Sequence, residues 1–499
     1  MFSVFITINI SQTLFAKAYG EEGVERLHSI CQTQDGGYIL SGRSNSFSSG
    51  DDDVFILKID KVGGLIWART YGGPDADIGN IGILTEDGGY LLLGETRSFG
   101  QGENDVLILK VNQNGDVEWA ETFGSPGYDA GISVIQAHDG GYVITGYTGF
   151  GAGAVDLLAL KIGPDGAFHW ARSFGGPGFD LGVLIIRTED GYAISGSEWG
   201  SGLLGGWNAY LLRLDVAGNP LWARLYGSGS DEQAQGIAQA PDGGFVFAGY
   251  TSVLGPQNYL VMKLSPAGDP MWAKAFGGES DDQAYPIIRA SDGGFVVAGY
   301  ACSFEGMDFL ILKLKESGDL EWARGFGGYW EEAAYNMIQT QDAGLAMVGF
   351  TVSYGAGNEE AAVLKIDPQG NYPECVVERT PNETPIMPLF VDYPNMTVID
   401  EPVYPVDITS IQVNPRVTEI CPTVGGNEAH SDWERGVLCR SVPGGLVFTA
   451  MSEATLKIYS PDGRLESTVE LKRGQNKVLL RPGIHFWHSG PYKGKAVVR

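Results

Sequence analysis

The sequence predicts an all-β fold, a seven-bladed β-propeller of four-stranded antiparallel blades followed by a small C-terminal β-sandwich. Two observations predict it. Short apolar segments recur with a period of about 52 residues, as between Trp67 and Trp119. Glycine accounts for 73 of the 499 residues, which suits a chain with many tight turns.

The segment between these two tryptophans defines the repeat. Its apolar runs are Ile78–Leu84, Tyr90–Gly94, Val106–Val111 and Val117–Thr122. Each run is rich in β-branched, aromatic or leucine residues and is bounded by Gly, Asp or Asn, the pattern of strands and turns. Asp87-Gly88-Gly89 reads as a tight hairpin turn. The repeat is therefore expected to be a four-stranded antiparallel meander.

The turn aspartate occurs seven times and the tryptophan six times. The aspartates are Asp35, Asp87, Asp139, Asp190, Asp242, Asp292 and Asp342, and the tryptophans are Trp67, Trp119, Trp170, Trp222, Trp272 and Trp322. The segment Phe15–Gly20 aligns with Trp272–Gly277, so Phe15 takes the missing aromatic position. The last repeat stops near Glu374, before its fourth strand. We expect the N-terminal segment to supply that strand and close the ring without an open edge.

Four regions follow one another along the chain. Residues 1–14 form an apolar run that is too short to span a bilayer and could be the remnant of a signal peptide. Residues 15–374 are the predicted propeller. Residues 375–440 are expected to be an extended linker, because nine of the 24 prolines lie between Pro373 and Pro422. Residues 441–499 contain short apolar runs around the turn Ser460–Gly463, which predict the β-sandwich.

Composition limits the possible partners. The formal net charge of −28 argues against nucleic acid and against an anionic membrane surface. We predict no transmembrane segment. Five cysteines in this length are no disulfide framework, although Cys375 and Cys421 flank the proline-rich segment and could pair in an exported protein.

The repeats resemble those of secreted bacterial propeller proteins. The matching pattern is an Asp-Gly-Gly turn, a strand, then Lys58-Ile59-Asp60 and Gly63 before Trp67. The segment Leu57–Trp67 is also similar to the tryptophan-docking repeat of quinoprotein dehydrogenases. The chain has no adjacent cysteine pair, so the quinone cofactor of those enzymes is not carried over. We predict no cofactor, apart from a calcium ion considered below.

The C-terminal region resembles the sorting domain of type IX secretion cargo. The matching segments are Leu456–Arg464, Arg481–Trp487 and Lys495–Arg499, while Val442-Pro443-Gly444 stands where such domains usually open with Pro-Asn-Pro. The resemblance implies that the protein is secreted or displayed on the outer cell surface, and that this region contacts the secretion machinery.

A carboxylate lies ten residues after every aromatic position. The seven are Glu25, Asp77, Asp129, Asp180, Glu232, Asp282 and Glu332, called here the ring carboxylates. We expect them to ring one face near the central channel, where they could hold a cation such as Ca²⁺. The alternative is that each one accepts hydrogen bonds from its own loop, and identity in every blade favours this structural role.

Ligand-binding residues are expected where the repeat is interrupted. The candidates are Trp199, Trp207, Tyr329 and Trp330, because exposed aromatic side chains on loops suit sugar rings or protein contacts. The alternative is that they fold back over the blades.

The sequence favours a binding or interaction scaffold, for a protein or a glycan, over an enzyme. No nucleophile elbow, phosphate loop or cysteine-pair zinc motif occurs in it. One alternative is a propeller glycoside hydrolase or lyase that uses two ring carboxylates as acid and base. Another is a structural or adhesive surface component.

Overall fold

The computed structural model describes residues 13–372 except 49, 101, 150–153, 201, 203, 303–305, 329 and 356–357, and beyond residue 372 the backbone of strands β29–β42. It divides into two compact units, Met1–Ile420 and Cys421–Arg499. The candidate residue Tyr329 and the pair Cys375 and Cys421 lie outside the described residues. No helix occurs in the described part, and so none there could span a membrane.

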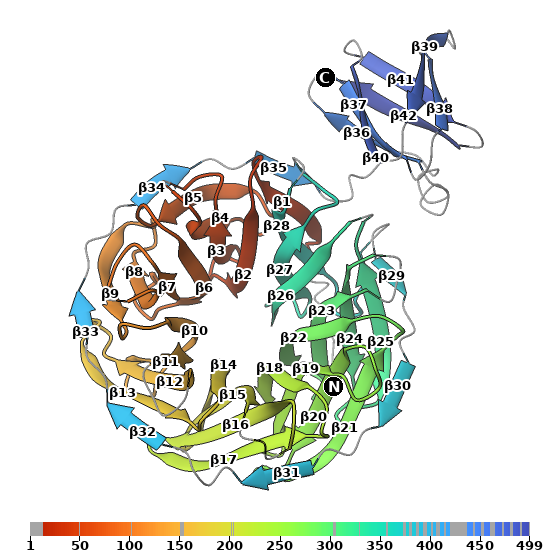
Figure 1. Ribbon diagram of the computed structural model, residues 1–499. Helices are drawn as coiled ribbons and strands as arrows, with labels where there is room; N and C mark the ends of the chain where they lie inside the picture. The colour runs from red at the N-terminus through yellow and green to blue at the C-terminus, as the bar shows by residue number, and fades with distance from the viewer. Residues whose placement is uncertain are drawn as a thin grey trace, which may run out of the picture. The chain divides into compact units, whose positions relative to one another are not determined.

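Seven four-stranded antiparallel meanders are arranged in a ring around a central axis (Figure 1). The first two blades are β2 (Glu25–Gln32), β3 (Tyr38–Ser44), β4 (Asp53–Ile59) and β5 (Leu65–Tyr71), then β6 (Asp77–Leu84), β7 (Tyr90–Thr96), β8 (Asp105–Val111) and β9 (Val117–Phe123). The next two are β10 (Asp129–Gln136), β11 (Tyr142–Thr148), β12 (Asp156–Ile162) and β13 (Phe168–Gly175), then β14 (Phe179–Thr188), β15 (Gly191–Trp199), β16 (Trp207–Asp215) and β17 (Pro220–Gly227). The predicted seven-bladed propeller is confirmed.

The remaining blades follow the same order, from the innermost strand outward. The fifth and sixth are β18 (Glu232–Gln239), β19 (Phe245–Thr251), β20 (Asn258–Leu264) and β21 (Pro270–Gly277), then β22 (Asp282–Arg289), β23 (Phe295–Ala301), β24 (Asp308–Leu314) and β25 (Leu320–Phe326). The seventh is β26 (Glu332–Gln339), β27 (Leu345–Thr351) and β28 (Glu360–Ile366), completed by β1 (Phe15–Gly20). Phe15 pairs with Lys365, so the N-terminal strand closes the ring as predicted.

The core lies in the layers between adjacent blades. Leu93 and Val106 of the second blade, for example, pack with Val134 and Leu158 of the third. The third strand of each blade is buried, as β8 is along its whole length, because it has a neighbouring strand on each side and a neighbouring blade on each face; only the two end residues of β16 are half-buried. The outermost strand β9 is less buried: Glu118 is exposed, and Val117, Trp119 and Glu121 are half-buried.

Residues repeated in every blade hold the blades together. The ring of Trp67 lies against Gly115 in the next blade, where a Cβ would be 3.2 Å from it. Within each blade the turn aspartate pairs with a buried cation of the third strand. The pairs are Lys58–Asp35, Lys110–Asp87, Lys161–Asp139, Arg213–Asp190, Lys263–Asp242, Lys313–Asp292 and Lys365–Asp342, with N–O distances of 2.6–3.3 Å.

The segment expected to be an extended linker instead runs around the propeller as a belt of seven short strands (Figure 1). These are β29 (Val376–Glu378), β30 (Asn382–Pro385), β31 (Leu389–Asp392), β32 (Thr397–Asp400), β33 (Val403–Pro405), β34 (Ser410–Val413) and β35 (Arg416–Glu419). They pair antiparallel with β25, β21, β17, β13, β9, β5 and β1 in turn, visiting the blades in the reverse of chain order. Each blade thus gains a fifth strand.

The proline content of the belt is compatible with this role. A strand at the edge of a sheet needs hydrogen bonds on one side only, so prolines are tolerated there and between the short strands. Without the belt, each blade would present an open outer edge.

The C-terminal unit consists of two antiparallel sheets. One contains β36 (Val437–Val442), β37 (Gly445–Ala450) and β40 (Gly474–Leu479). The other contains β39 (Leu465–Leu471), β38 (Ala454–Tyr459), β41 (Gly483–Ser489) and β42 (Tyr492–Val498), in that order.

Candidate functional site

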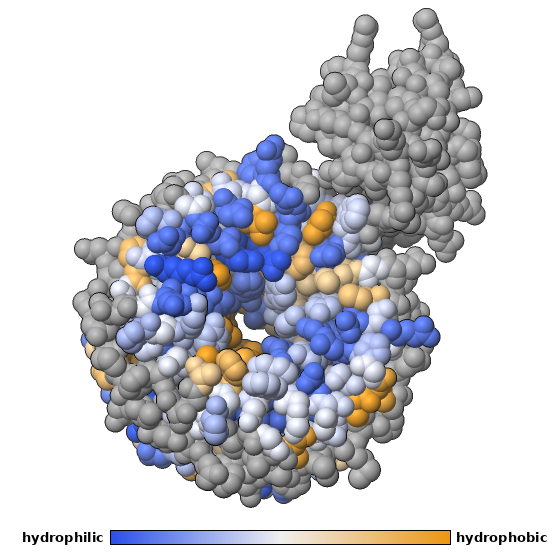
Figure 2. Space-filling model, in the orientation of Figure 1, coloured by the Kyte–Doolittle hydropathy of each residue, from blue (hydrophilic) through white to orange (hydrophobic). Residues whose placement is uncertain are grey.

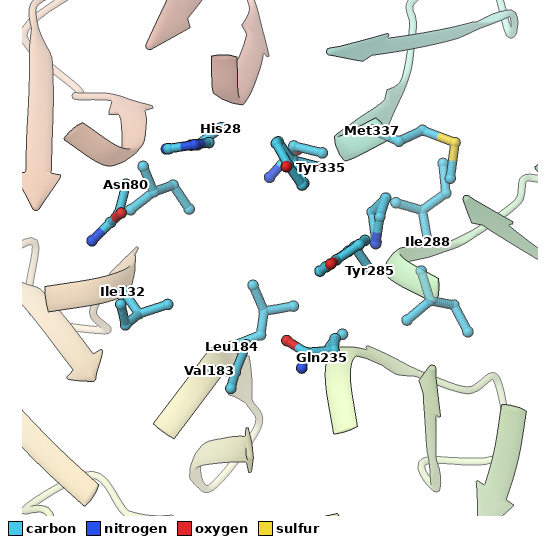
Figure 3. A pocket seen from close by; sticks show the side chains of 15 residues that line it. His28, Asn80, Ile132, Val183, Leu184, Gln235, Tyr285, Ile288, Tyr335 and Met337 are labelled. Atoms are coloured by element: carbon cyan, nitrogen blue, oxygen red, sulfur yellow. The ribbon is translucent and has the colours of Figure 1, made fainter. Parts of the chain in front are cut away.

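The seven innermost strands line a central channel with one side chain each at an equivalent position, three residues after the ring carboxylate. These residues are His28, Asn80, Ile132, Val183, Gln235, Tyr285 and Tyr335. The channel forms a cavity of about 400 Å³, which Leu184, Ile288 and Met337 also line (Figure 3). This volume falls within the usual range for small-molecule sites. An opening at the centre of the ring is visible in the space-filling view (Figure 2).

The alternation of a β-strand places these side chains in the channel. In β2, Glu25 and Leu27 are buried, whereas Arg26 and His28 are partly exposed. The side chain of the ring carboxylate therefore points into the blade, while the side chains one and three residues later point away from it. The side chains that face the channel differ from blade to blade.

The channel has an aromatic side and an aliphatic side (Figure 3). The rings of Tyr285 and Tyr335 meet edge to face with centroids 5.4 Å apart, and the His28 ring lies 5.5 Å from Tyr335. Val183 and Leu184 lie across the cavity from these rings. A ligand in the channel would therefore contact aromatic rings on one side and aliphatic groups on the other.

His28 is an uncharged hydrogen-bond acceptor in this wall. Its Nδ1 lies 2.8 Å from the carbonyl oxygen of Gly79. A carbonyl can only accept, so Nδ1 carries the proton and Nε2 has the free lone pair. The pKa of His28 is lowered to about 4, mainly by burial and also by the positive charges of Arg43 and Arg26, against the raising effect of the Gly79 bond. The ring is therefore neutral at physiological pH.

Two amide side chains add further acceptors. Asn80 donates from Nδ2 to the carbonyl oxygen of Gly131 over 2.9 Å. Gln235 donates from Nε2 to Oε1 of Gln233 over 3.2 Å. In both residues one N–H of the NH₂ group is thus engaged with the protein, and the amide oxygen can receive a hydrogen bond from a ligand.

The two channel tyrosines keep their protons. Burial raises the pKa of Tyr285 and of Tyr335 above the ordinary value. The Tyr285 hydroxyl donates to Oε1 of Gln283 over 3.0 Å, which fixes the orientation of its ring. Both phenols are therefore neutral polar groups on a rigid aromatic surface.

The positive charges of Arg26 and Arg43 act on His28, and each of these arginines pairs with a carboxylate. Arg26 pairs with Glu359, and Arg43 Nη1 lies 2.7 Å from Asp52. A second cavity of about 530 Å³ is lined by Arg43, Asp52 and Arg97, among others. Hydrophilic residues gather over the blades of β2–β4 and β6–β8 in the view of Figure 2.

The ring carboxylates are the first residues of the innermost strands, except Asp180, which is the second residue of β14, and all seven are buried, with at most 1% of their surface exposed. Each one accepts a hydrogen bond from the backbone N–H four residues earlier, over 2.6–3.0 Å. These bonds hold the loop that crosses from one blade to the next. Burial raises the pKa of Asp77 and of Glu332, against the lowering effect of the hydrogen bonds that they accept.

The ring carboxylates do not line the channel cavity. Among the described residues, no group of three or more His, Cys, Asp or Glu side chains is arranged to hold a metal ion. Calcium binding stays a prediction.

The candidate tryptophans lie outside the channel cavity: Trp199 ends β15, Trp207 begins β16, and only Trp330 lies in a loop, the one before β26. Trp199 and Trp207 are cross-strand partners whose ring centroids are 6.4 Å apart, and Trp199 is 46% exposed. Trp330 is 40% exposed, and its backbone N–H donates to Ser353 Oγ over 2.8 Å. Neither group lines the 400 Å³ cavity.

The channel residues are not among the ligand-binding candidates that the sequence predicts. Their signal was present at a fixed offset, thirteen residues after each aromatic position, where the residue type changes from blade to blade. Variation at one position of an otherwise regular repeat is the pattern expected of a binding surface on a repeated scaffold.

No protein-family model and no curated protein matches the chain. Among solved structures it is similar to PorZ, an essential surface component of the type IX secretion system of Porphyromonas gingivalis, at 11% identity and a TM-score of 0.39, covering 94% of this chain and 58% of that one. It is similar to puromycin hydrolase at 14% identity and a TM-score of 0.41, covering 68% and 52%. It is similar to an endo-1,5-α-L-arabinanase from Thermotoga petrophila at 12% identity and a TM-score of 0.24, covering 71% and 100%. The chain thus spans little more than half the length of the first two.

Proposed function

We propose that this protein is an exported or cell-surface binding scaffold that holds its ligand in the propeller channel. The observation that carries this proposal is the contrast between two equivalent positions of the innermost strands. The ring carboxylate is the same type of residue in every blade and is buried. The position three residues later faces the channel and ranges from His28 to Ile132 to Tyr335.

The alternative function, that of a glycoside hydrolase or lyase, is less well supported by the structure. It would need a carboxylic acid and a carboxylate with different environments on either side of a substrate bond. The ring carboxylates are buried, and all seven bind a backbone N–H in the same way. Groups committed to holding the loops are poorly placed to exchange protons with a substrate.

Ligand capture by the full-length protein tests the proposal. The immobilised chain is incubated with cell-surface polysaccharide and protein extracts, and retained material is compared with that of a Tyr335→Ala variant. Phe168→Ala is the matched control, since it removes an exposed aromatic side chain from the outermost strand β13. We expect capture by the wild type and the control, and strong loss with Tyr335→Ala. Equal capture by all three would refute a channel site, and release of sugar from the polysaccharides would favour the hydrolase.

Export is supported by the resemblance of the C-terminal segments to type IX sorting domains. Residues 445–499 also carry nine basic against four acidic side chains, opposite in sign to the chain as a whole. The test compares the cellular location of the full chain with that of a chain ending at residue 420 in a host with this pathway. We expect surface location for the full chain and periplasmic retention of the shorter one. An identical location of the two would contradict this part of the proposal.

A further inference from the structure

We infer that the channel recognises an uncharged, hydroxyl-rich carbohydrate. This inference rests on the proposed binding function and names the ligand class of the same site. It draws on the charge of the wall, its hydrogen-bonding character and its aromatic surface.

The first step concerns charge. Among the described residues that line the 400 Å³ cavity there is no Lys, Arg, Asp or Glu, and His28 is neutral. Arg26 and Arg43, whose charges act on His28, are already paired with Glu359 and Asp52. A carboxylate, phosphate or ammonium group placed in the channel would lose its hydration without gaining an opposite charge, which is strongly unfavourable. The wall therefore selects an uncharged ligand.

The second step concerns hydrogen bonding. His28 presents Nε2 because its Nδ1–H binds a protein acceptor, and Asn80 and Gln235 present amide oxygens, while one N–H of each amide binds a protein acceptor. These three acceptors come from three different innermost strands. A ligand that satisfies them must supply several donors, and hydroxyl groups do so. A peptide backbone offers equal numbers of donors and acceptors and would match this wall less well.

The third step concerns shape and apolar contact. A sugar ring has an apolar C–H face and a rim of hydroxyl groups, and aromatic side chains pack well against such a face. Tyr285 and Tyr335 supply rigid aromatic surface on one side, with Val183 and Leu184 opposite (Figure 3). His28 lies beside this aromatic surface, and Asn80 lies next to His28 in the same view. The polar and apolar groups of the wall are thus arranged as a sugar ring requires.

Calorimetric titration of the full-length protein tests the inference. The probes are short neutral oligosaccharides of glucose, mannose, galactose or N-acetylglucosamine, uronic-acid oligosaccharides of similar length, and uncharged peptides. We expect at least one neutral oligosaccharide to bind and the uronic-acid oligosaccharides not to bind. Tyr335→Ala should weaken binding at least tenfold, and Gln235→Leu, which removes one acceptor, severalfold. Phe168→Ala should leave affinity unchanged, and melting curves verify that each variant is folded.

Each other outcome is informative. Tyr335-dependent binding of a peptide, with no neutral oligosaccharide bound, would overturn the carbohydrate inference and leave the binding function intact. Oligosaccharide binding that neither Tyr335→Ala nor Gln235→Leu weakens would place the site elsewhere and overturn the inference. If no ligand bound in the titrations or in the capture experiment, both the carbohydrate inference and the proposed binding function would be overturned.

Discussion

Gly124 lies where two buried carboxylates of adjacent blades approach the end of β9. A Cβ at this position would overlap Asp105 Oδ1 and lie 3.0 Å from Asp129 Oδ2. Equivalent glycines follow or end every outermost strand, at Gly20, Gly72, Gly175, Gly227, Gly277 and Gly327. Gly124→Ala should therefore lower the free energy of unfolding by about 1–3 kcal/mol, as overpacking of a core does. Urea unfolding measures the change.

The control for this substitution lies in the same loop. A Cβ on Gly127 would have its nearest neighbours at 3.5 Å, an ordinary contact distance. Gly127→Ala should change stability by less than about 0.5 kcal/mol. If both variants unfolded alike, the close approach of the two carboxylates would not be the reason for glycine at position 124.

His28 links stability to pH. Its pKa is about 4 in the folded protein, below the ordinary 6.5, so the unfolded chain binds the proton more readily. The neutral ring contributes its full stability above pH 6.5 and loses it as the pH falls toward 4. The positive charges of Arg26 and Arg43 disfavour protonation of the ring, and the ring of Tyr335 packs against it. Between pH 7 and pH 4 the free energy of unfolding of the wild type should fall by up to about 3 kcal/mol more than that of the His28→Gln variant. If the melting temperatures of the wild type and the His28→Gln variant changed with pH in parallel, this prediction would be wrong.

At the level of residues, the sequence predicted correctly those positions that have the same structural role in every blade. The fixed spacing of turn residues such as Asp87 indicated the repeat, and the alignment of Phe15 with the tryptophan position indicated ring closure. The hypothesis of a cation site placed the ring carboxylates near the channel. Because side chains alternate along a β-strand, each of these carboxylates instead points into the interior of its blade. The channel residues share no chemistry, so no motif marks them, and only their constant offset reveals that they meet.

At the level of elements, the belt was not predictable from residue patterns. Runs such as Thr397–Asp400 contain four residues, too few for a strand signal, and frequent prolines favour an extended chain without sheet partners. What makes these runs strands is the outer edge of each blade, as where Val398 pairs with Phe174. That edge exists only after the propeller has formed, so the information lies in the tertiary structure.

The belt is expected to stabilise the propeller and protect it from aggregation. A chain that ends at residue 420 keeps all seven belt strands, and a chain that ends at residue 372 loses them. We expect the first to melt at nearly the temperature of the full chain. The second should melt several degrees lower and aggregate on standing, because seven strand edges become available for pairing. Thermal melts and light scattering measure both effects, and matching behaviour of the two chains would show that the belt adds no stability.

At the scale of the whole molecule, a ring depends on the strand that joins its ends. β1 is paired on both sides, with β28 and with the last belt strand β35, so it closes the blades and anchors the belt. Five of its six residues are buried, including Phe15 and Tyr19. Loss of one such aromatic side chain costs about 3–5 kcal/mol, and loss of the strand also removes two ladders of hydrogen bonds.

Deletion of residues 1–20 should therefore destabilise the propeller by more than about 5 kcal/mol, measured by urea unfolding. Deletion of residues 421–499 is the control, because this segment is a separate compact unit and its removal leaves every blade and belt strand in place. The propeller transition should then be unchanged. Equal transitions for the two deletions would mean that the contacts between the first and seventh blades, such as Arg26 with Glu359, hold the ring closed without β1.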